Sequence, residues 1–309
     1  MTSVTAGAAP QRPSTIRIWL LAIRPATLPA AMSGVAVGLG AALAVDTPFR
    51  LDAAIGCLAV ALLLQVTANL ANDLSDFRKG ADTPDRTGPI RVAAAGLVTE
   101  RQLEVAIGVT VGLAGVVGLW LTLIGGPVLL ALGALAIVAA LAYTGGPWPY
   151  GYRGLGEVFV FIFFGLVAVG GTAYLQAGRL EPLFVGAAIP VGALTTAILV
   201  VNNLRDIPTD AAAGKRTLAV ILGRRATTME YILLLAVAFL VPVALAVAGR
   251  GVAVLLPLLA LPLAAPLLRT VRTFAEPRQL NPVLKGTARL ALIQGLLFAA
   301  GLAIGGAIA

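Results

Sequence analysis

Long apolar blocks follow one another along the chain, separated by short segments that contain charged residues, glycine or proline. Most blocks contain about 20 residues, the length that a helix needs to cross the hydrocarbon core of a bilayer. The pattern predicts an all-α, polytopic membrane protein with nine spanning helices, at residues 18–44, 51–72, 103–124, 127–145, 155–177, 183–204, 229–249, 251–271 and 287–308. The junctions at Gly126 and Gly251 are tight, so eight or ten spans stay open as alternatives.

The composition agrees with this pattern and excludes several classes of protein. Of the 309 residues, 59% are hydrophobic and 12% are charged, which excludes a soluble globular domain and a disordered chain. The chain has no histidine and a single cysteine, Cys57. It therefore cannot form an intrachain disulfide, a Cys/His zinc site, a histidine-ligated haem or a Ser-His-Asp triad. Any metal site must use oxygen ligands, which favours Mg²⁺ or a similar hard cation.

The basic residues are distributed unequally between the two sides that nine spans create. One side would hold the N-terminus and four loops, near 78–101, 146–153, 205–225 and 269–289. That side carries 19 of the 22 Lys and Arg residues, and the other side carries only Arg50, Arg179 and Arg250. Cytoplasmic loops are enriched in Lys and Arg. The pattern predicts a multi-pass protein of the cell membrane with its N-terminus in the cytoplasm, and the net charge of +8 reflects topology and not nucleic-acid binding.

Six of the eight Asp residues lie in two short clusters, each at the same end of a predicted helix. Asn72 and Asp76 in the first cluster correspond to Asn202 and Asp206 in the second after a shift of 130 positions. This correspondence indicates a weak internal repeat. We expect one transmembrane domain, residues 16–309, with related units at about 16–145 and 155–250, and a mobile N-terminal segment at 1–15.

The spacing within each cluster places its polar side chains on one helical face. Asn202, Asp206 and Asp210 recur every four residues, and Asn72 and Asp76 have the same spacing. Carboxylates crowded in this way repel one another unless cations lie between them. Mg²⁺ that bridges a diphosphate would relieve the repulsion and neutralise a leaving group. The alternative is that these are ordinary solvated loop acids balanced by neighbouring bases.

Two residues are expected to interrupt the helices near the clusters. Asp82 follows Asp76 by six residues, so it can rejoin the cluster only if the helix breaks at Gly80. Pro208 indicates that the second helix loosens near Asp206.

Basic residues are interleaved with the acids, at Arg78, Lys79, Arg91, Arg205, Lys215 and Arg216. Carboxylates mixed with Lys and Arg suit a metal-bound polyanion such as a phosphate. We expect Lys79, Arg205 and Lys215 to take part in binding it. Arg24, inside the first apolar block, could either extend to the membrane interface or meet an anionic substrate.

Three of the five Tyr residues lie in the segment 143–152. An aromatic ring near a developing carbocation stabilises it through a cation–π interaction. Aromatic residues also gather at membrane interfaces for simple amphipathic reasons. The sequence leaves both explanations open for each Tyr.

These motifs together resemble the UbiA-type intramembrane aromatic prenyltransferase superfamily, from about residue 17 to the end of the chain. The resemblance is carried by Arg24-Pro25-Ala-Thr27-Leu28, Asn72-Asp73-x₂-Asp76-x₃-Gly80-x-Asp82, Thr87-Gly88-Pro89-Ile-Arg91 with Gly96-Leu97, Tyr143-Thr-Gly-Gly-Pro147, and Asn202-Asn203-x-Arg205-Asp206-x₃-Asp210-x₃-Gly214-Lys215-x-Thr217-Leu218. Within the superfamily the chain most closely resembles the 1,4-dihydroxy-2-naphthoate polyprenyltransferases of menaquinone synthesis. Many members of the superfamily have an Asp at the position of Gly80, where this chain has its acid two residues later, as Asp82.

The resemblance implies nine helices around a central cavity, two Asp-rich motifs at its cytoplasmic rim and a lateral opening to lipid. It implies Mg²⁺-dependent transfer of a polyprenyl chain from polyprenyl diphosphate to an aromatic ring; for dihydroxynaphthoate the products are CO₂, demethylmenaquinol and diphosphate. The implied metal ligands are Asp76 and Asp82 with Asn72, and Asp206 and Asp210 with Asn202. The implied substrate-binding residues are Lys79, Arg91, Arg205 and Lys215 for the diphosphate end, Tyr143 beside the allylic cation, and Arg24 or Arg153 for the acceptor carboxylate.

Two alternatives remain at the level of the sequence. A prenyltransferase with another aromatic acceptor, such as 4-hydroxybenzoate, would have the same Asp-rich motifs. A cation-coupled secondary transporter would also have paired repeats and Asp residues within its helices, but its Asp residues would lie near the bilayer midplane.

Overall fold

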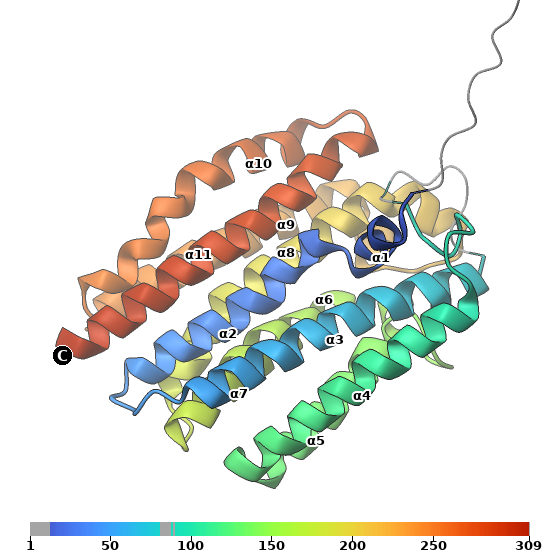
Figure 1. Ribbon diagram of the computed structural model, residues 1–309. Helices are drawn as coiled ribbons and strands as arrows, with labels where there is room; N and C mark the ends of the chain where they lie inside the picture. Colours follow the sequence, from blue (N-terminus) through green and yellow to red (C-terminus); the bar gives the residue numbers. More distant parts are fainter. Residues whose placement is uncertain (1–12, 81–87, 89, 309) are drawn as a thin grey trace, which may run out of the picture.

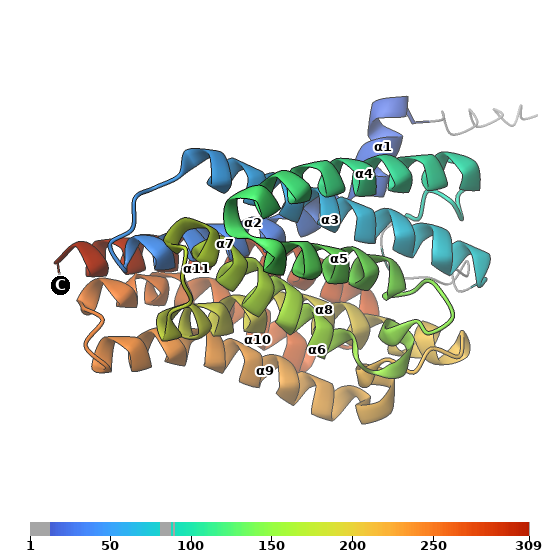
Figure 2. The same ribbon diagram turned by 90° about the horizontal axis from the view of Figure 1, so that it is seen from below.

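The computed structural model is a bundle of long helices that run roughly along one axis (Figures 1 and 2). It describes residues 13–80, 88 and 90–308. The regular elements in these residues are all helical: α1 (Thr15–Ile23), η1 (Pro25–Thr27), α2 (Leu28–Leu43), α3 (Leu51–Arg78), α4 (Glu100–Gly125), α5 (Pro127–Ala142), η2 (Tyr150–Arg153), α6 (Gly156–Val160), η3 (Phe161–Val167), α7 (Ala168–Ala177), α8 (Pro182–Ala212), α9 (Leu218–Val247), η4 (Val252–Ala260), α10 (Leu261–Thr273), η5 (Pro277–Gln279) and α11 (Leu280–Ile308).

The helical content confirms the all-α membrane class. Eight helical segments of the described residues are long and apolar enough to cross a membrane, and the shorter α5 brings the number to the nine that the sequence predicts. The tight junctions separate two helices each, because Gly126 (φ 85°) and Gly251 (φ 82°) adopt backbone angles that glycine accepts readily. The expected mobile segment 1–15 lies almost entirely outside the described residues.

Several helices extend beyond the predicted spans. The helix α3 continues to Arg78 and α8 to Ala212, so both polar clusters begin on helices. The predicted break at Gly80 is present, with a φ of 64° directly after the end of α3. The predicted loosening at Pro208 is not, because α8 continues through this residue to Ala212. The helix α9 begins at Leu218, eleven positions before the predicted start of that span, and bends at Gly223.

The first predicted span is broken near its start. Arg24 has a left-handed backbone (φ 55°) and precedes Pro25, so α1 ends and turns away from the axis of α2 (Figures 1 and 2). The break leaves helix-end carbonyl groups that need hydrogen-bond donors. The side chain of Asn69 on α3 donates to the carbonyl of Ile23 at 2.8 Å, and the hydroxyl of Thr27 donates to the carbonyl of Arg24 at 2.9 Å.

Small residues set the close helix contacts. A Cβ at Gly40 on α2 would lie 2.4 Å from the carbonyl oxygen of Ala299 on α11, and one at Gly165 of η3 would lie 2.8 Å from the Cα of Gly192 on α8. Lipid tails are as apolar as the side chains, so helices in a membrane associate through close packing rather than through burial from water. These contacts hold α2, α8, α11 and the π-helical η3 together around the interior of the bundle.

Candidate active site

A cavity of about 430 Å³ extends from the polar helix ends into the interior of the bundle. Its walls come from α2, α3, α5, α8 and the α6–η3 segment. The carboxyl ends of α3 and α8 lie at the same end of the bundle (Figure 1). Asn72 and Asp76 from α3 therefore share this cavity with Asn202, Asp206 and Asp210 from α8. The remaining wall is mainly apolar, as expected for a site that binds a largely hydrocarbon ligand.

Of the two acids of the first cluster that the structure describes, Asp76 makes more side-chain contacts than Asp73. Its side chain is 2% exposed, and its two oxygens meet the Arg91 guanidinium at 2.8 Å, the Tyr152 hydroxyl at 2.6 Å and the Lys215 ammonium at 3.2 Å. Burying a carboxylate is costly unless it is paired and hydrogen-bonded. These three donors compensate for its burial, and they come from three different loops.

Tyr152 joins the cations of both clusters. The ammonium groups of Lys79 and Lys215 lie 4.7 and 4.8 Å from the centre of its ring. Burial, and then the negative charge of Asp76, raise the pKa of Tyr152, so its hydroxyl remains a hydrogen-bond donor at neutral pH. Burial lowers the pKa of Lys79; the negative charge of Asp76 opposes this shift, and the positive charge of Lys215 adds to it.

The second cluster is organised by the arginine within it. The guanidinium of Arg205, 1% exposed, donates to both carboxylate oxygens of Asp206 at 2.8 and 2.6 Å. It also donates to Asn202 at 2.9 Å and to Asn281 on α11 at 2.9 Å. The planar fork of an arginine holds a carboxylate in a fixed orientation. Arg205 therefore sets the positions of the first two side chains of the α8 face.

Asp73 serves a different purpose from Asp76. It is 1% exposed, is absent from the cavity wall, and accepts a hydrogen bond from the backbone N–H of Val92 at 3.1 Å. It anchors the loop that brings Arg91 to the site.

The donor chemistry of the cavity fits a hard cation that carries phosphate. All five candidate ligands bear oxygen: Asn72, Asp76, Asn202, Asp206 and Asp210. Among the described residues, no three acids lie close enough together to hold a metal unaided, and Asp82 lies outside these residues. Mg²⁺ is usually held by one or two carboxylates together with substrate phosphates, so a sparse protein ligand set is what it requires.

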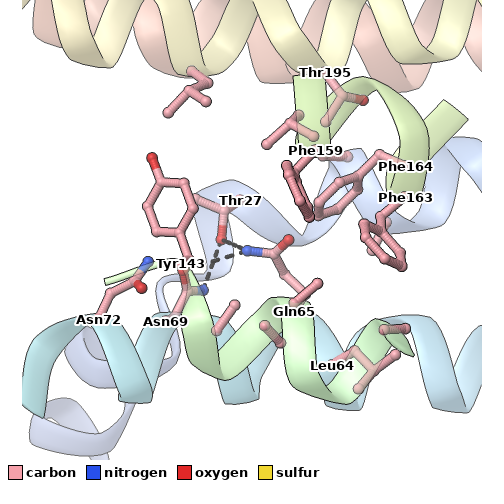
Figure 3. A pocket seen from close by; sticks show the side chains of 18 of the residues that line it. Thr27, Leu64, Gln65, Asn69, Asn72, Tyr143, Phe159, Phe163, Phe164 and Thr195 are labelled. Carbon is pink, nitrogen blue, oxygen red and sulfur yellow. Dashed lines mark hydrogen bonds between the residues drawn. The ribbon is translucent and has the colours of Figure 1, made fainter. Parts of the chain in front are cut away.

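The wall below this polar end is aromatic. Tyr143 meets Tyr150 edge to face at 5.4 Å, Tyr150 stacks on Phe159 at 4.1 Å, and Phe159 stacks on Phe163 at 6.2 Å between ring centroids. Figure 3 shows Tyr143 beside Asn72 and the phenylalanines farther along the cavity. This column leads from the acidic clusters into the apolar interior.

The family model of the UbiA prenyltransferase family matches residues 31–283 of this chain. The chain belongs to the UbiA prenyltransferase family. The matched residues contain both polar clusters and the aromatic column, so most of the cavity wall lies inside the matched region, and Arg24 and Thr27 lie just before it.

Relatives and solved structures of the UbiA family cover nearly the whole chain. A 1,4-dihydroxy-2-naphthoate octaprenyltransferase from Mycobacterium tuberculosis is 44% identical over 93% of this chain and 97% of that protein. One from Haemophilus influenzae is 39% identical over 94% and 97%. The structure of a UbiA homologue from Archaeoglobus fulgidus bound to GPP and Mg²⁺ matches with a TM-score of 0.64 at 16% identity, over 93% of this chain and 99% of that one.

The structure brings together most of the site residues that the sequence predicts. The cavity wall includes Arg24, Asn72, Asp76, Arg91, Tyr143, Asn202, Asp206, Asp210 and Lys215. Lys79 and Arg205 lie just behind this wall and contact residues of it. Arg153 lies apart from the wall, with its guanidinium 5.3 Å from the centre of the Trp148 ring.

Sequence reasoning missed several polar residues of the site. Tyr152 was grouped with its neighbours but not singled out, and Thr144, which donates to Asn72 at 2.9 Å, was not named as a site residue. Gln65 and Asn69 were also missed, although two amides spaced by four residues within an apolar span are a detectable signal.

Proposed function

We propose that this protein transfers a polyprenyl chain from polyprenyl diphosphate to 1,4-dihydroxy-2-naphthoate with loss of CO₂, giving demethylmenaquinol and diphosphate. The observation that carries the proposal is that two Asn-x₃-Asp faces, on α3 and α8, meet in one cavity that continues into an apolar interior. The relatives at 44% and 39% identity, which cover nearly the whole chain, are named for the same acceptor.

The polar end would bind the diphosphate through Mg²⁺. The side chains that would hold the metal are the oxygen ligands of both clusters: Asn72, Asp76, Asp82, Asn202, Asp206 and Asp210. When bound, Mg²⁺ neutralises charge on the diphosphate and makes it a better leaving group. The solved UbiA homologue from Archaeoglobus fulgidus, which was bound to GPP and Mg²⁺, supports this assignment.

The basic side chains would bind the diphosphate oxygens directly. Lys215 lies 3.2 Å from Asp76 and 3.8 Å from Asp210, between the two clusters, where the diphosphate would lie. Arg91 contacts Asp76, Lys79 lies over the ring of Tyr152, and Arg205 holds Asp206 in place. Charge-assisted contacts to phosphate would replace part of their contacts to carboxylates.

The aromatic column would protect the reacting carbon. The ring of Tyr143 lines the cavity next to Asn72, so its π face can stabilise positive charge on the allylic carbon as the C–O bond breaks. Water would quench this cation, and the apolar wall below Tyr143 excludes it.

The acceptor would react at the carbon that bears its carboxylate. Arg24 lines the cavity and Arg153 does not, which favours Arg24 as the partner of that carboxylate. The ring carbon donates an electron pair to the allylic carbon while the bond to diphosphate breaks. The electron pair released with CO₂ then restores the aromatic ring.

The charge distribution supports a location in the cell membrane with the polar end of the cavity at the cytoplasmic face. The loops around that end carry Lys79, Arg91, Lys215 and Arg216, and they belong to the side with 19 of the 22 basic residues. The diphosphate would then bind from the cytoplasm while the prenyl tail extends into lipid.

The test uses the purified protein in detergent with polyprenyl diphosphate, Mg²⁺ and either dihydroxynaphthoate or 4-hydroxybenzoate. We expect demethylmenaquinol by mass spectrometry, with CO₂ and diphosphate in equal amounts, and no product from 4-hydroxybenzoate. Prenylation of 4-hydroxybenzoate without CO₂ would assign a different acceptor. Transport of a solute into vesicles without consumption of the diphosphate ester would contradict an enzyme altogether.

A further inference from the structure

A cluster of uncharged polar side chains lies in the cavity wall farther along α3 than the acidic end. Gln65 and Asn69 project from α3 toward Thr27 at the break between α1 and α2 (Figure 3). Gln65 Nε2 donates to Thr27 Oγ1 at 3.2 Å and to Asn69 Oδ1 at 3.3 Å, and Asn69 Nδ2 donates to Thr27 Oγ1 at 2.9 Å. All three residues line the cavity.

The hydrogen bonds of this cluster fix which end of the Gln65 amide faces the cavity. The backbone carbonyl of Ile23 can only accept, so the group of Asn69 that meets it at 2.8 Å is its Nδ2. The Oδ1 of Asn69 must then face Gln65, which places Gln65 Nε2 inside the cluster. The carbonyl oxygen of Gln65 is therefore directed away from the cluster, into the cavity, as Figure 3 shows.

The opposite wall offers a flat aromatic surface. Phe159, Phe163 and Phe164 face the cavity from α6 and η3, across from Gln65 (Figure 3). The segment η3 is a π-helix, which changes the spacing of side chains along its face and recurs at functional sites. A planar ring placed here would contact phenyl rings on one side and a single hydrogen-bond acceptor on the other.

We propose that the space between Gln65 and the three phenylalanines binds the aromatic acceptor. The Gln65 carbonyl accepts a hydrogen bond from the acceptor's second hydroxyl, which is para to the hydroxyl next to the carboxylate. The proposal rests on the proposed function for the identity of the acceptor. The carboxylate-bearing carbon must meet the allylic carbon near Tyr143, and Arg24 is the cation of the cavity wall that lies close to Thr27 in the chain. The second hydroxyl, on the ring carbon two positions from the carboxylate-bearing carbon, then points along α3 toward Gln65. A site built to bind a hydroxyl discriminates against the analogue that lacks it, because its buried polar group is left unpaired.

The test compares 1,4-dihydroxy-2-naphthoate with 1-hydroxy-2-naphthoate as a competitive inhibitor, in the wild type and in Gln65→Met. In the wild type we expect the analogue to bind about tenfold more weakly than the dihydroxy acceptor. In Gln65→Met the ratio of the two binding constants, analogue over dihydroxy acceptor, should fall to about one, because only the dihydroxy acceptor loses a hydrogen bond. The KM for polyprenyl diphosphate should not change.

A second variant and two controls separate binding from folding. Gln65→Asn keeps an amide on a side chain shorter by one methylene. It should no longer discriminate between the two ligands, and it should disturb the polar cluster less than Gln65→Met does. Leu64→Met, a neighbouring apolar residue of the wall, should keep the wild-type ratio. Phe164→Leu should weaken both ligands equally, since both carry the naphthalene ring.

Three results would overturn the proposal. The first is equal binding of the two ligands by the wild type, and the second is an equal loss of affinity for both ligands in Gln65→Met and Gln65→Asn. The third is that these variants change only the KM for polyprenyl diphosphate, by raising it. Failure of the wild type to prenylate dihydroxynaphthoate would be seen first, in the turnover assay, and would count against the proposed function instead.

Discussion

The ammonium of Lys215 lies 3.2 Å from a carboxylate oxygen of Asp76, although the two residues belong to different polar clusters. Asp76 is near the end of α3, and Lys215 follows the end of α8. The contact therefore joins the two halves of the site across the space where a diphosphate would bind. The predictions below follow from this arrangement.

Replacement of Asp76 by Asn should reduce kcat by about a thousandfold or more, because it removes a metal ligand and the shared counter-ion of Arg91 and Lys215. Steady-state kinetics with the purified variant measures this. Asp73→Asn is the matched control, since Asp73 is absent from the cavity wall and an amide oxygen at this position can still accept from the Val92 N–H and hold the loop that carries Arg91. It should lower the thermal midpoint while kcat stays within about threefold. An Asp76→Asn enzyme that keeps most of its activity would exclude Asp76 as a metal ligand.

Arg205→Lys should raise the Mg²⁺ concentration needed for half-maximal activity by about tenfold or more. A lysine ammonium cannot donate to both oxygens of Asp206 and still reach Asn202 and Asn281, so the α8 ligands lose their fixed orientation. A Mg²⁺ titration of turnover checks this. Arg216→Lys, at an exposed position, should leave the titration unchanged. An equal rise in the required Mg²⁺ concentration in both variants would contradict a specific role for the forked geometry of the Arg205 guanidinium.

Tyr143→Phe and Tyr143→Leu separate the ring from the hydroxyl. If the π face stabilises the allylic cation, Tyr143→Phe should keep kcat within about fivefold of the wild type, and Tyr143→Leu should lose about a hundredfold. Single-turnover rates with saturating substrates measure the chemical step. Equal losses in the two variants would show that the hydroxyl carries the effect.

Chelation of divalent cations should abolish turnover, and added Mg²⁺ should restore it. The described carboxylates are paired with basic side chains and do not cluster with one another, so they need a divalent cation to bind the diphosphate. The readout is diphosphate release before and after EDTA treatment. Undiminished release in excess EDTA would contradict metal-dependent ionisation. The thermal midpoint, measured alongside, should change little, since the ion pairs of Asp76 and Asp206 form without metal.

The sequence predicted the parts of the site that depend on short-range spacing. Asn202, Asp206 and Asp210 share the α8 face because residues four apart are neighbours on any helix, and the break at Gly80 was predicted from the six-residue offset between Asp76 and Asp82. Apolar blocks and the breaks between them predicted nine spans, which among the described residues correspond to eight long apolar helical segments and the shorter α5. The repeat relationship between 16–145 and 155–250 stays a prediction.

Contacts that depend on loop paths could not be predicted in this way. Arg91 reaches Asp76 because Asp73 anchors its loop, while Arg153 turns to Trp148; nothing local in the sequence distinguishes the two arginines. Pro208 was expected to loosen α8, but the helix continues through it to Ala212, and Leu204 and Ile207 just before the proline pack into the main apolar core. The π-helical turn of η3 packs closely against Gly192 of α8 and has no simple sequence signature.

The most direct test of the central claim, that the two clusters form one metal–diphosphate site, is a structure of the protein with Mn²⁺ and an unreactive prenyl thiodiphosphate. The account predicts Mn²⁺ in contact with Asp76 on α3 and with Asp206 or Asp210 on α8, and the thiodiphosphate between them with Lys215 on its oxygens. A thiodiphosphate bound elsewhere, or Mn²⁺ held by only one of the two helices, would contradict it.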